Sequence, residues 1–462
     1  MLAHGLVLAL FAAAPAGPIE GFLDEAMPRS GVPGVAYAVV SGDEVRTGAR
    51  GVVRLGSETS VTPDTAFLLG SISKSFTALA VMQLVEAGSV DLDAEVCRYL
   101  EVFSGSPGSS ITVRELLSHT SGYSTLQGNG AHVEPAGEQA LARQVEVAAT
   151  VVPAHVPGST WQYSNLNYQI LGRLIEVVSG QAFHTYVESN ILQPIGMTDS
   201  FVSDGEAHEA MATGHLPWFG YKRPLPGNDT SRSTAPHGGV VASASDLALY
   251  MQVMLSGEDD ILSAAGKAAM MRPASEASPF YGLGWFVDPQ TGEVWHTGTS
   301  PGFETIATMI PADHAGAVVL TNASSGLGFA ESTALRVGVT TRALGLDPVD
   351  HGSRWSQKAL FVALTLAPLA FLLSIAWAWR AREALRAKSG PFGLFSLWFP
   401  LLTTGVGAWL MIEQIPNLYG VPLGTLRRFQ PDFALVLFAS ATTGVAWAVF
   451  RLAVAYSAPR RA

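Results

Sequence analysis

Ser71 and Lys74 place a hydroxyl and an amine three residues apart, in the stretch Ser71-Ile72-Ser73-Lys74. Residues 65–70 are mostly apolar and end in glycine, which predicts an extended segment. Apolar side chains at helical spacing from Lys74 onward predict a helix that stops at Gly88. One turn of that helix brings Lys74 to the same face as Ser71, where a neutral amine can take the serine proton. This arrangement is typical of acyl-transfer enzymes.

The same four residues also fit a serine that caps a helix and a lysine that faces water. A second motif, Tyr163-Ser164-Asn165, favours chemistry over that alternative. It follows a turn-rich stretch at 157–162 and precedes a helix expected from about Tyr168 to Val178. A tyrosine beside an amine can share proton transfer, and an asparagine two residues later can bind a substrate amide.

A third motif, His296-Thr297-Gly298, lies on a predicted strand that follows the turn at 288–292. Small residues here let a substrate lie along the edge of the strand. The backbone N–H of Thr299 is then placed to complete an oxyanion hole.

In order and spacing these motifs resemble the S-x-x-K, Y-x-N and [KH]-T-G boxes of the penicillin-binding-protein and class C β-lactamase superfamily of serine hydrolases. The resemblance covers roughly residues 20–345 and includes further matching segments at 111–122, 194–197, 238–240 and 281–285. It implies an α/β (α+β) fold of the β-lactamase/transpeptidase type, with an antiparallel sheet flanked by helices and a helical subdomain.

The resemblance implies a role for each matching residue. Ser71 corresponds to the acylated nucleophile, Lys74 to its proton partner, and Tyr163 to the residue that shares general acid and base work. Asn165 corresponds to the side chain that orients the substrate amide.

The third box supplies the substrate-binding strand, with Thr297, Gly298 and Thr299 beside the substrate. The N–H groups of Ser71 and Thr299 would form the oxyanion hole. His296 stands where most β-lactamases of this family carry lysine. Histidine at this place is a feature of members that act as D-alanyl-D-alanine carboxypeptidases, peptidases or esterases, and a neutral imidazole binds a carboxylate less strongly than an ammonium does.

Other residues with catalytic potential are assigned to structure. His119, in the stretch His119-Thr120-Ser121-Gly122, corresponds in relatives to a structural turn. The remaining histidines lack the spacing of metal ligands, so the sequence indicates no metal and no cofactor.

Composition places part of the chain in lipid, because 48% of its residues are hydrophobic and 14% are charged. Three C-terminal runs have the length of membrane spans, at about 359–379, 392–412 and 433–456. Tryptophan and tyrosine at their edges suit anchoring at the membrane surface. The expected organisation is therefore a signal peptide at 1–17, a hydrolase domain at 18–350, a linker at 351–358 and three transmembrane helices in 359–462.

Charge predicts the orientation of these spans. The connection between the first two carries Arg380, Arg382, Arg386 and Lys388, and the tail carries Arg460 and Arg461, so the positive-inside rule assigns both to the cytoplasm. Arg427 and Arg428, between the second and third spans, weaken this asymmetry without reversing it. The hydrolase domain is then periplasmic or extracellular.

Residues 351–462 hold 11 Lys+Arg and 3 Asp+Glu, which leaves a net charge of −19 in residues 1–350. An acidic domain disfavours nucleic acid as a partner. The loop-rich segment 205–234 is expected near the site as a specificity element.

The sequence therefore predicts a multi-pass protein of the cytoplasmic membrane whose outer domain cleaves amides through a Ser71 acyl-enzyme. The substrate is expected to be a small molecule or peptide of the N-acyl-D-amino-acid or D-alanyl-D-alanine type, and no particular oligomeric state is indicated. The three-span arrangement resembles the colibactin-maturing type of prodrug peptidase. An esterase or β-lactamase of the same family is the alternative, and a membrane sensor that is acylated without turnover is the alternative from another class.

Overall fold

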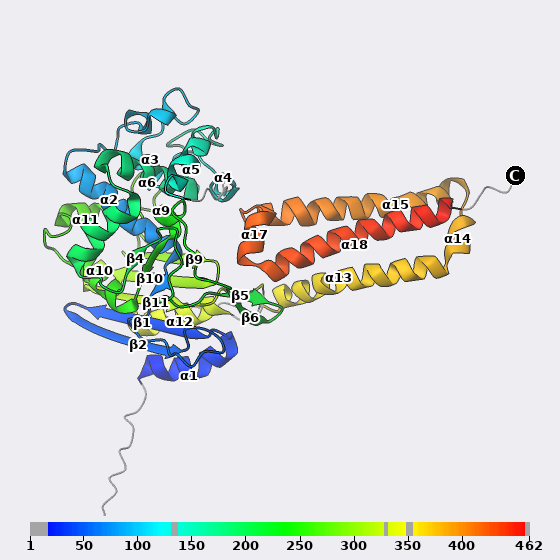
Figure 1. Cartoon of the computed structure of the whole chain (residues 1–462), viewed down its shortest axis with the longest axis horizontal. Helices are drawn as coiled ribbons and strands as arrows, with labels where there is room; N and C mark the ends of the chain where they lie inside the picture. Colours follow the sequence, from blue (N-terminus) through cyan, green and yellow to red (C-terminus); the bar gives the residue numbers. More distant parts are fainter. Residues whose placement is uncertain (1–16, 131–136, 328–330, 348–353, 458–462) are drawn as a thin grey trace, which may run out of the picture.

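A computed structural model describes residues 17–130, 137–327, 331–347 and 354–457. Within these ranges a body of strands and helices is followed by three long helices that project from it (Figure 1). Residues 1–16 of the predicted signal peptide, residues 351–353 of the predicted linker, and Arg460 and Arg461 lie outside the described residues.

The main sheet of the described chain is antiparallel, with six strands in the order β2-β1-β11-β10-β9-β8. The strands are β1 (Gly34–Ser41), β2 (Glu44–Gly51), β8 (Phe286–Val287), β9 (Val294–Ser300), β10 (Phe303–Ile310) and β11 (Ala315–Thr321). The central strands β1, β10 and β11 are buried along nearly their whole length, whereas the edge strand β2 is exposed. The central strands must therefore be covered on both faces.

Helices supply that cover. On one face, α1 (Pro18–Ser30) and α12 (Ser332–Leu344) pack Leu23 and Leu335 against Val35 and Val319. On the other face, α10 (Ala244–Leu255) contacts β1 and β11 and belongs to the larger core, which continues into the helical subdomain. The site lies where that subdomain meets β9.

The remaining elements of the body are short apart from α2 and α6. The helices are α2 (Ser73–Glu86), α3 (Val113–Leu117), α4 (Thr125–Gly130), α5 (Ala140–Ala149), α6 (Asn165–Ser179), α7 (Phe183–Val187), α8 (Gln193–Ile195), α9 (Ala235–Gly238) and α11 (Ala264–Met270). A small sheet has the order β3 (Phe67–Leu68), β7 (Val240–Ala242) and β4 (Phe201–Val202), and β5 (His215–Trp218) pairs with β6 (Tyr221–Pro224).

The predicted fold is confirmed, with two local differences. The helix expected from Tyr168 begins at Asn165, because Ser164 is the last extended residue (φ −137°, ψ 120°) and the helix follows it directly. The segment 205–234, expected to be loop-rich, contains the β5–β6 hairpin.

In the described C-terminal part, three helices are long and apolar enough to cross a membrane. They are α13 (Trp355–Arg380), a second helix over Gly390–Leu418, and α18 (Pro431–Tyr456). The second comprises α15 (Gly390–Trp409), a π-helical turn (Leu410–Gln414) and α16 (Ile415–Leu418). At about 1.5 Å per residue, 26 residues exceed the roughly 30 Å apolar layer of a bilayer.

The three helices begin earlier than the apolar runs suggested, and the first two also end later. α13 starts at Trp355, four residues before the predicted span and inside the predicted linker, and the second helix continues to Leu418. Polar residues can continue a helix beyond its apolar stretch, so hydrophobicity alone underestimates its length. α18 packs against both α13 and α15 and is the most buried of the three (Figure 1).

The membrane-type helices contact the body of strands and helices at the end near α17 (Leu423–Phe429). Phe219, in the β5–β6 turn, packs in an apolar cluster with Phe361, Leu426 and Phe433, and its N–H donates to Asp432 Oδ2 at 2.8 Å. The two parts of the chain are thus joined by both apolar and polar contacts.

Candidate active site

Ser71 lies in a short 3₁₀ turn, Gly70–Ile72, between β3 and α2. Gly70 has a φ of +58°, a left-handed conformation that glycine adopts readily. A Cβ at this position would lie 2.6 Å from the backbone nitrogen of Thr299, so the close approach of the turn to β9 also requires glycine. The turn thereby brings the backbone of Ser71 beside that of Thr299.

Lys74, in the first turn of α2, is completely buried. Its Nζ lies 3.0 Å from Ser71 Oγ, 2.8 Å from Asn165 Oδ1 and 2.8 Å from the carbonyl oxygen of His237. Burial penalises the charged ammonium and lowers the pKa of Lys74 well below its ordinary value. The side chain is therefore suited to be a neutral amine.

The partners of Lys74 fix how such an amine is oriented. The oxygens of Asn165 and His237 only accept hydrogen bonds, so they take the two N–H groups of the neutral amine. The orientation of the Asn165 amide is set by its Nδ2, which donates to Asn129 Oδ1 at 2.8 Å. The remaining lone pair of Lys74 then faces Ser71 Oγ, which is the geometry of a general base and its nucleophile.

Tyr163 completes this group from the stretch before α6. Lys74 Nζ lies 4.9 Å from the centre of its ring. Burial raises the pKa of Tyr163 above its ordinary value, and a hydrogen bond with Ser71 opposes this shift. A neutral phenol next to both Ser71 and Lys74 is able to donate a proton to a leaving group.

His119 packs against the ring of Tyr163 and does not line the cavity. Its Nδ1 accepts from the backbone N–H of Ser164 at 3.1 Å, and its ring centre lies 4.4 Å from that of Tyr163. Burial lowers the pKa of His119, so its ring is neutral. The structural interpretation made from the sequence fits this geometry.

The third box lies on β9, as predicted. Thr297 and Thr299 are exposed along the strand, whereas His296 and Gly298 face inward. A Cβ at Gly298 would collide with the carbonyl oxygen of Leu69, so glycine permits the contact between β9 and the Ser71 turn. Gly298 contributes through this close packing and does not line the cavity.

His296 differs electrostatically from the lysine found at this place in most β-lactamases. Its Nδ1 donates to the carbonyl oxygen of Thr297 at 2.7 Å, and Nε2 lies 3.2 Å from the hydroxyl of Tyr281. Burial is the main cause that lowers the pKa of His296, to about 3. The strand therefore carries no positive charge at neutral pH.

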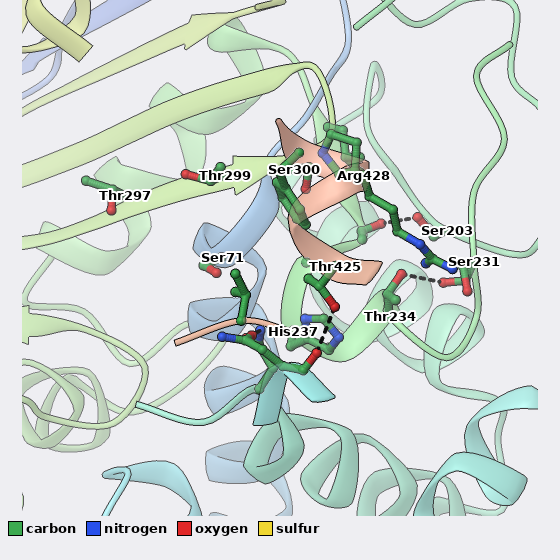
Figure 2. A pocket seen from close by; sticks show the side chains of 18 of the residues that line it. Ser71, Ser203, Ser231, Thr234, His237, Thr297, Thr299, Ser300, Thr425 and Arg428 are labelled. Carbon is green, nitrogen blue, oxygen red and sulfur yellow. Dashed lines mark hydrogen bonds between the residues drawn. The ribbon is translucent and has the colours of Figure 1, made fainter. Parts of the chain in front are cut away.

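These residues meet at a cavity of about 640 Å³ (Figure 2). Six of the residues predicted from the sequence line it, namely Ser71, Tyr163, Asn165, His296, Thr297 and Thr299. Lys74 lies behind Ser71. The cavity is also lined by four residues of the segment 205–234, which was expected to lie near the site, namely Asp229, Thr230, Ser231 and Thr234.

Sequence reasoning missed a whole wall of this cavity. This wall comes from α17 and the residues just before it, which lie between the second and third membrane-type helices. The lining residues here are Val421, Thr425, Arg428 and Phe429. One signal was present in the sequence, since Arg427 and Arg428 place positive charge in the connection predicted to lie on the outer side, where the positive-inside rule disfavours it.

Asn129 was also missed, and it connects this wall to Lys74. Its side-chain Nδ2 donates to the carbonyl oxygen of Gly420 at 2.9 Å, and its backbone carbonyl oxygen accepts from Thr425 Oγ1 at 3.0 Å. Its Oδ1 accepts from Asn165, which in turn accepts from Lys74. A continuous hydrogen-bond path therefore runs from the catalytic group to α17.

Comparison with known proteins agrees with the fold. The family model described as Beta-lactamase matches residues 19–341, which is more than half of the chain. The chain therefore belongs to the β-lactamase family and, with it, to a superfamily of serine hydrolases that includes penicillin-binding proteins. The three membrane-type helices lie outside the matched residues.

Three similar proteins are penicillin-binding proteins or amidohydrolases by name. Penicillin-binding protein 4 of Amycolatopsis lactamdurans is 32% identical over 321 residues, which cover 64% of this chain and 83% of that protein. The octameric penicillin-binding protein homologue from Pyrococcus abyssi is 26% identical with a TM-score of 0.62, over 71% of this chain and 77% of that one. A D-stereospecific amidohydrolase from Streptomyces sp. is 27% identical with a TM-score of 0.54, over 64% of this chain and 92% of that one.

Proposed function

We propose that this protein is a membrane-anchored, extracytoplasmic serine hydrolase that cleaves an amide bond of a D-amino-acid-type substrate through an acyl-enzyme on Ser71. The observation that carries the proposal is the environment of Lys74. A fully buried amine with two carbonyl acceptors and a serine hydroxyl at 3.0 Å is arranged to remove the serine proton.

The reaction takes place in two steps. Ser71 Oγ attacks the amide carbonyl carbon while its proton passes to Lys74 Nζ, and the N–H groups of Ser71 and Thr299 stabilise the oxyanion. The C–N bond then breaks, and the leaving amine receives a proton from Lys74 through Tyr163. Water attacks the acyl-enzyme in the second step, with the same groups moving its proton in reverse.

Two observations support an amide of D-amino-acid type. His296 is neutral, and by the family resemblance a histidine at this place is a feature of peptidases and esterases rather than of most β-lactamases. A similar protein is named as a D-stereospecific amidohydrolase, and its similarity extends over 92% of its own chain.

Membrane anchoring is supported by the apolar surface of the three helices. Leu373, Leu402 and Trp398 have more than half of their surface exposed, an arrangement that water disfavours and lipid accepts. The helix α14 (Arg382–Arg386) lies at the end remote from the hydrolase body (Figure 1). If this basic end is cytoplasmic, the hydrolase body lies on the outer side.

The test uses the full chain in detergent and its Ser71→Ala variant. Each is incubated with N-acyl-D-amino-acid amides, their L-enantiomers, D-alanyl-D-alanine peptides and a fluorescent penicillin, and products are identified by mass spectrometry. We expect Ser71-dependent cleavage of D-amides in preference to L-amides. A stable Ser71 adduct without turnover would instead support a sensor, and equal cleavage of both enantiomers would contradict the proposed substrate class.

A further inference from the structure

The α17 wall of the cavity is held firmly in place. Gly420 and Thr425 are hydrogen-bonded to Asn129 at 2.9 and 3.0 Å, and Leu426 is buried in the apolar cluster with Phe361 and Phe433. Gln430, immediately after α17, donates to the carbonyl oxygen of Ser325 at 2.6 Å. A side chain of α17 that faces the cavity is therefore positioned relative to Ser71.

The charges around the cavity are unevenly distributed. Lys74 lies behind Ser71 as a neutral amine, and the His296 ring on β9 is neutral. Among the described residues that line the cavity, Asp229 and Arg428 carry the formal charges. Figure 2 shows the Arg428 side chain extending from α17 toward Ser203 and Ser231. The guanidinium of the cavity is thus supplied by the membrane-side part of the chain.

We propose that Arg428 binds a carboxylate of the substrate, so that α17 provides the cation that the His296 strand lacks. The substrate class is accordingly a small-molecule amide or ester that bears a free carboxylate away from the bond that is cleaved. This inference rests on the proposed function of the Ser71 site.

The chemistry of the surroundings favours this assignment. The planar guanidinium of arginine matches the two oxygens of a carboxylate. The hydroxyl of Ser231 lies on the same side and can donate as well, whereas the hydroxyl of Ser203 already donates to the carbonyl oxygen of Gly239. The carboxylate of Asp229 repels an anion, which leaves the Arg428 side as the favourable position. Residues 1–350 carry a net charge of −19, which repels an anionic substrate, so a local cation favours its binding.

The adjacent Arg427 offers a matched control. Both arginines belong to α17 and both are exposed, but Arg428 lines the cavity and Arg427 does not. Loss of either changes the net charge equally, so only a direct contact distinguishes them.

The experiment measures kcat/KM of the full chain for pairs of esters that differ in a carboxylate. In the first arm, para-nitrophenyl half-esters from succinate to suberate are compared with neutral para-nitrophenyl esters of matched length. In the second arm, the carboxylate is on the leaving group, and butyrate esters of para-hydroxybenzoate and para-hydroxybenzamide are compared. The ratio of acid to neutral rates is recorded for the wild type and for Arg428→Gln, Arg428→Lys and Arg427→Gln.

In at least one arm, the wild type should have a higher kcat/KM for the acid than for the neutral ester. Arg428→Gln should reduce this ratio about tenfold, as for the loss of a charged hydrogen bond. Arg428→Lys should retain part of it, and Arg427→Gln should keep the wild-type ratio. Ser71-dependent hydrolysis whose ratios do not change in Arg428→Gln, or change equally in Arg427→Gln, would overturn the role of Arg428 alone. Hydrolysis that persists unchanged in Ser71→Ala would overturn the proposed function and this inference with it.

Discussion

The cavity has two walls of opposite physical character. The catalytic wall of the proposed mechanism, formed by Ser71, Tyr163, Asn165 and Thr299, backs onto the fully buried Lys74, and burial shifts the pKa values of Lys74 and Tyr163 in favour of their neutral forms. The membrane-side wall, formed by Val421, Thr425, Arg428 and Phe429, presents an exposed guanidinium. In the proposed account, bond cleavage depends on the buried network around Lys74, whereas substrate selection depends on the charge of Arg428.

The largest effect is expected from the catalytic wall. Lys74→Met keeps an unbranched side chain of similar length but removes the base, so kcat/KM should fall about 10³-fold, as for loss of a general base. Steady-state hydrolysis of a para-nitrophenyl ester measures this fall, and Ser71→Ala serves as the reference for complete loss. A variant that stays within about tenfold of the wild type would show that Lys74 is not the base.

The pH dependence should reflect the same buried amine. Catalysis needs neutral Lys74, whose pKa is lowered by burial from the model-compound value of 10.5, so activity is full above the lowered pKa and lost below it. The profile of kcat/KM should therefore reach its plateau well below pH 10.5 and fall about tenfold per unit on its acid side. A rate that still rises up to that pH would mean that Lys74 keeps an ordinary pKa.

A smaller effect is expected at the link between the walls. Asn129→Ala removes the side-chain contacts to Asn165 and Gly420, which should misorient Asn165 and lower kcat/KM about tenfold. Gln127→Ala is the matched control, because Gln127 lies on the same helix but donates to Val152 at 2.7 Å, away from α17. Equal losses in both variants would indicate a general defect of α4 instead.

The smallest effect concerns stability. The pKa of His296 is lowered to about 3, so the ring binds a proton in the unfolded chain before it does so in the folded one. Its contribution to stability is present above the unfolded pKa of 6.5 and is lost as pH falls below it, by about 1.4 kcal/mol per unit.

Thermal unfolding of the detergent-solubilised protein at pH 7.5 and 5.5 checks this expectation. When the pH is lowered from the first value to the second, His296→Gln should lose less stability than the wild type, because one ring no longer titrates. An unchanged pH dependence in the variant would show that His296 is not held neutral by the fold.

The sequence could predict the catalytic wall because much of it is local. Ser71 and Lys74 are three residues apart on a helical turn, and the other boxes follow in a recognisable order. The three long helices were predictable from their apolar runs, although their polar ends were not. The fold class followed from the family resemblance.

The membrane-side wall depends on contacts that sequence spacing does not reveal. Asn129 reaches Gly420 and Thr425 across almost 300 positions, and Lys74 reaches the carbonyl oxygen of His237, a group that every residue possesses. Backbone acceptors and long-range pairs have no sequence pattern of their own, so only the folded chain identifies them.

Identification of the acylated residue tests the account at its core. The full chain is mixed with an N-acyl-D-alanine para-nitrophenyl ester, quenched in acid at short times, digested and mapped by mass spectrometry. We expect the acyl group on Ser71 in the wild type, a much slower appearance in Lys74→Met and none in Ser71→Ala. An acyl group on another residue, or equal labelling in Ser71→Ala, would contradict the assignment of Ser71 as the nucleophile.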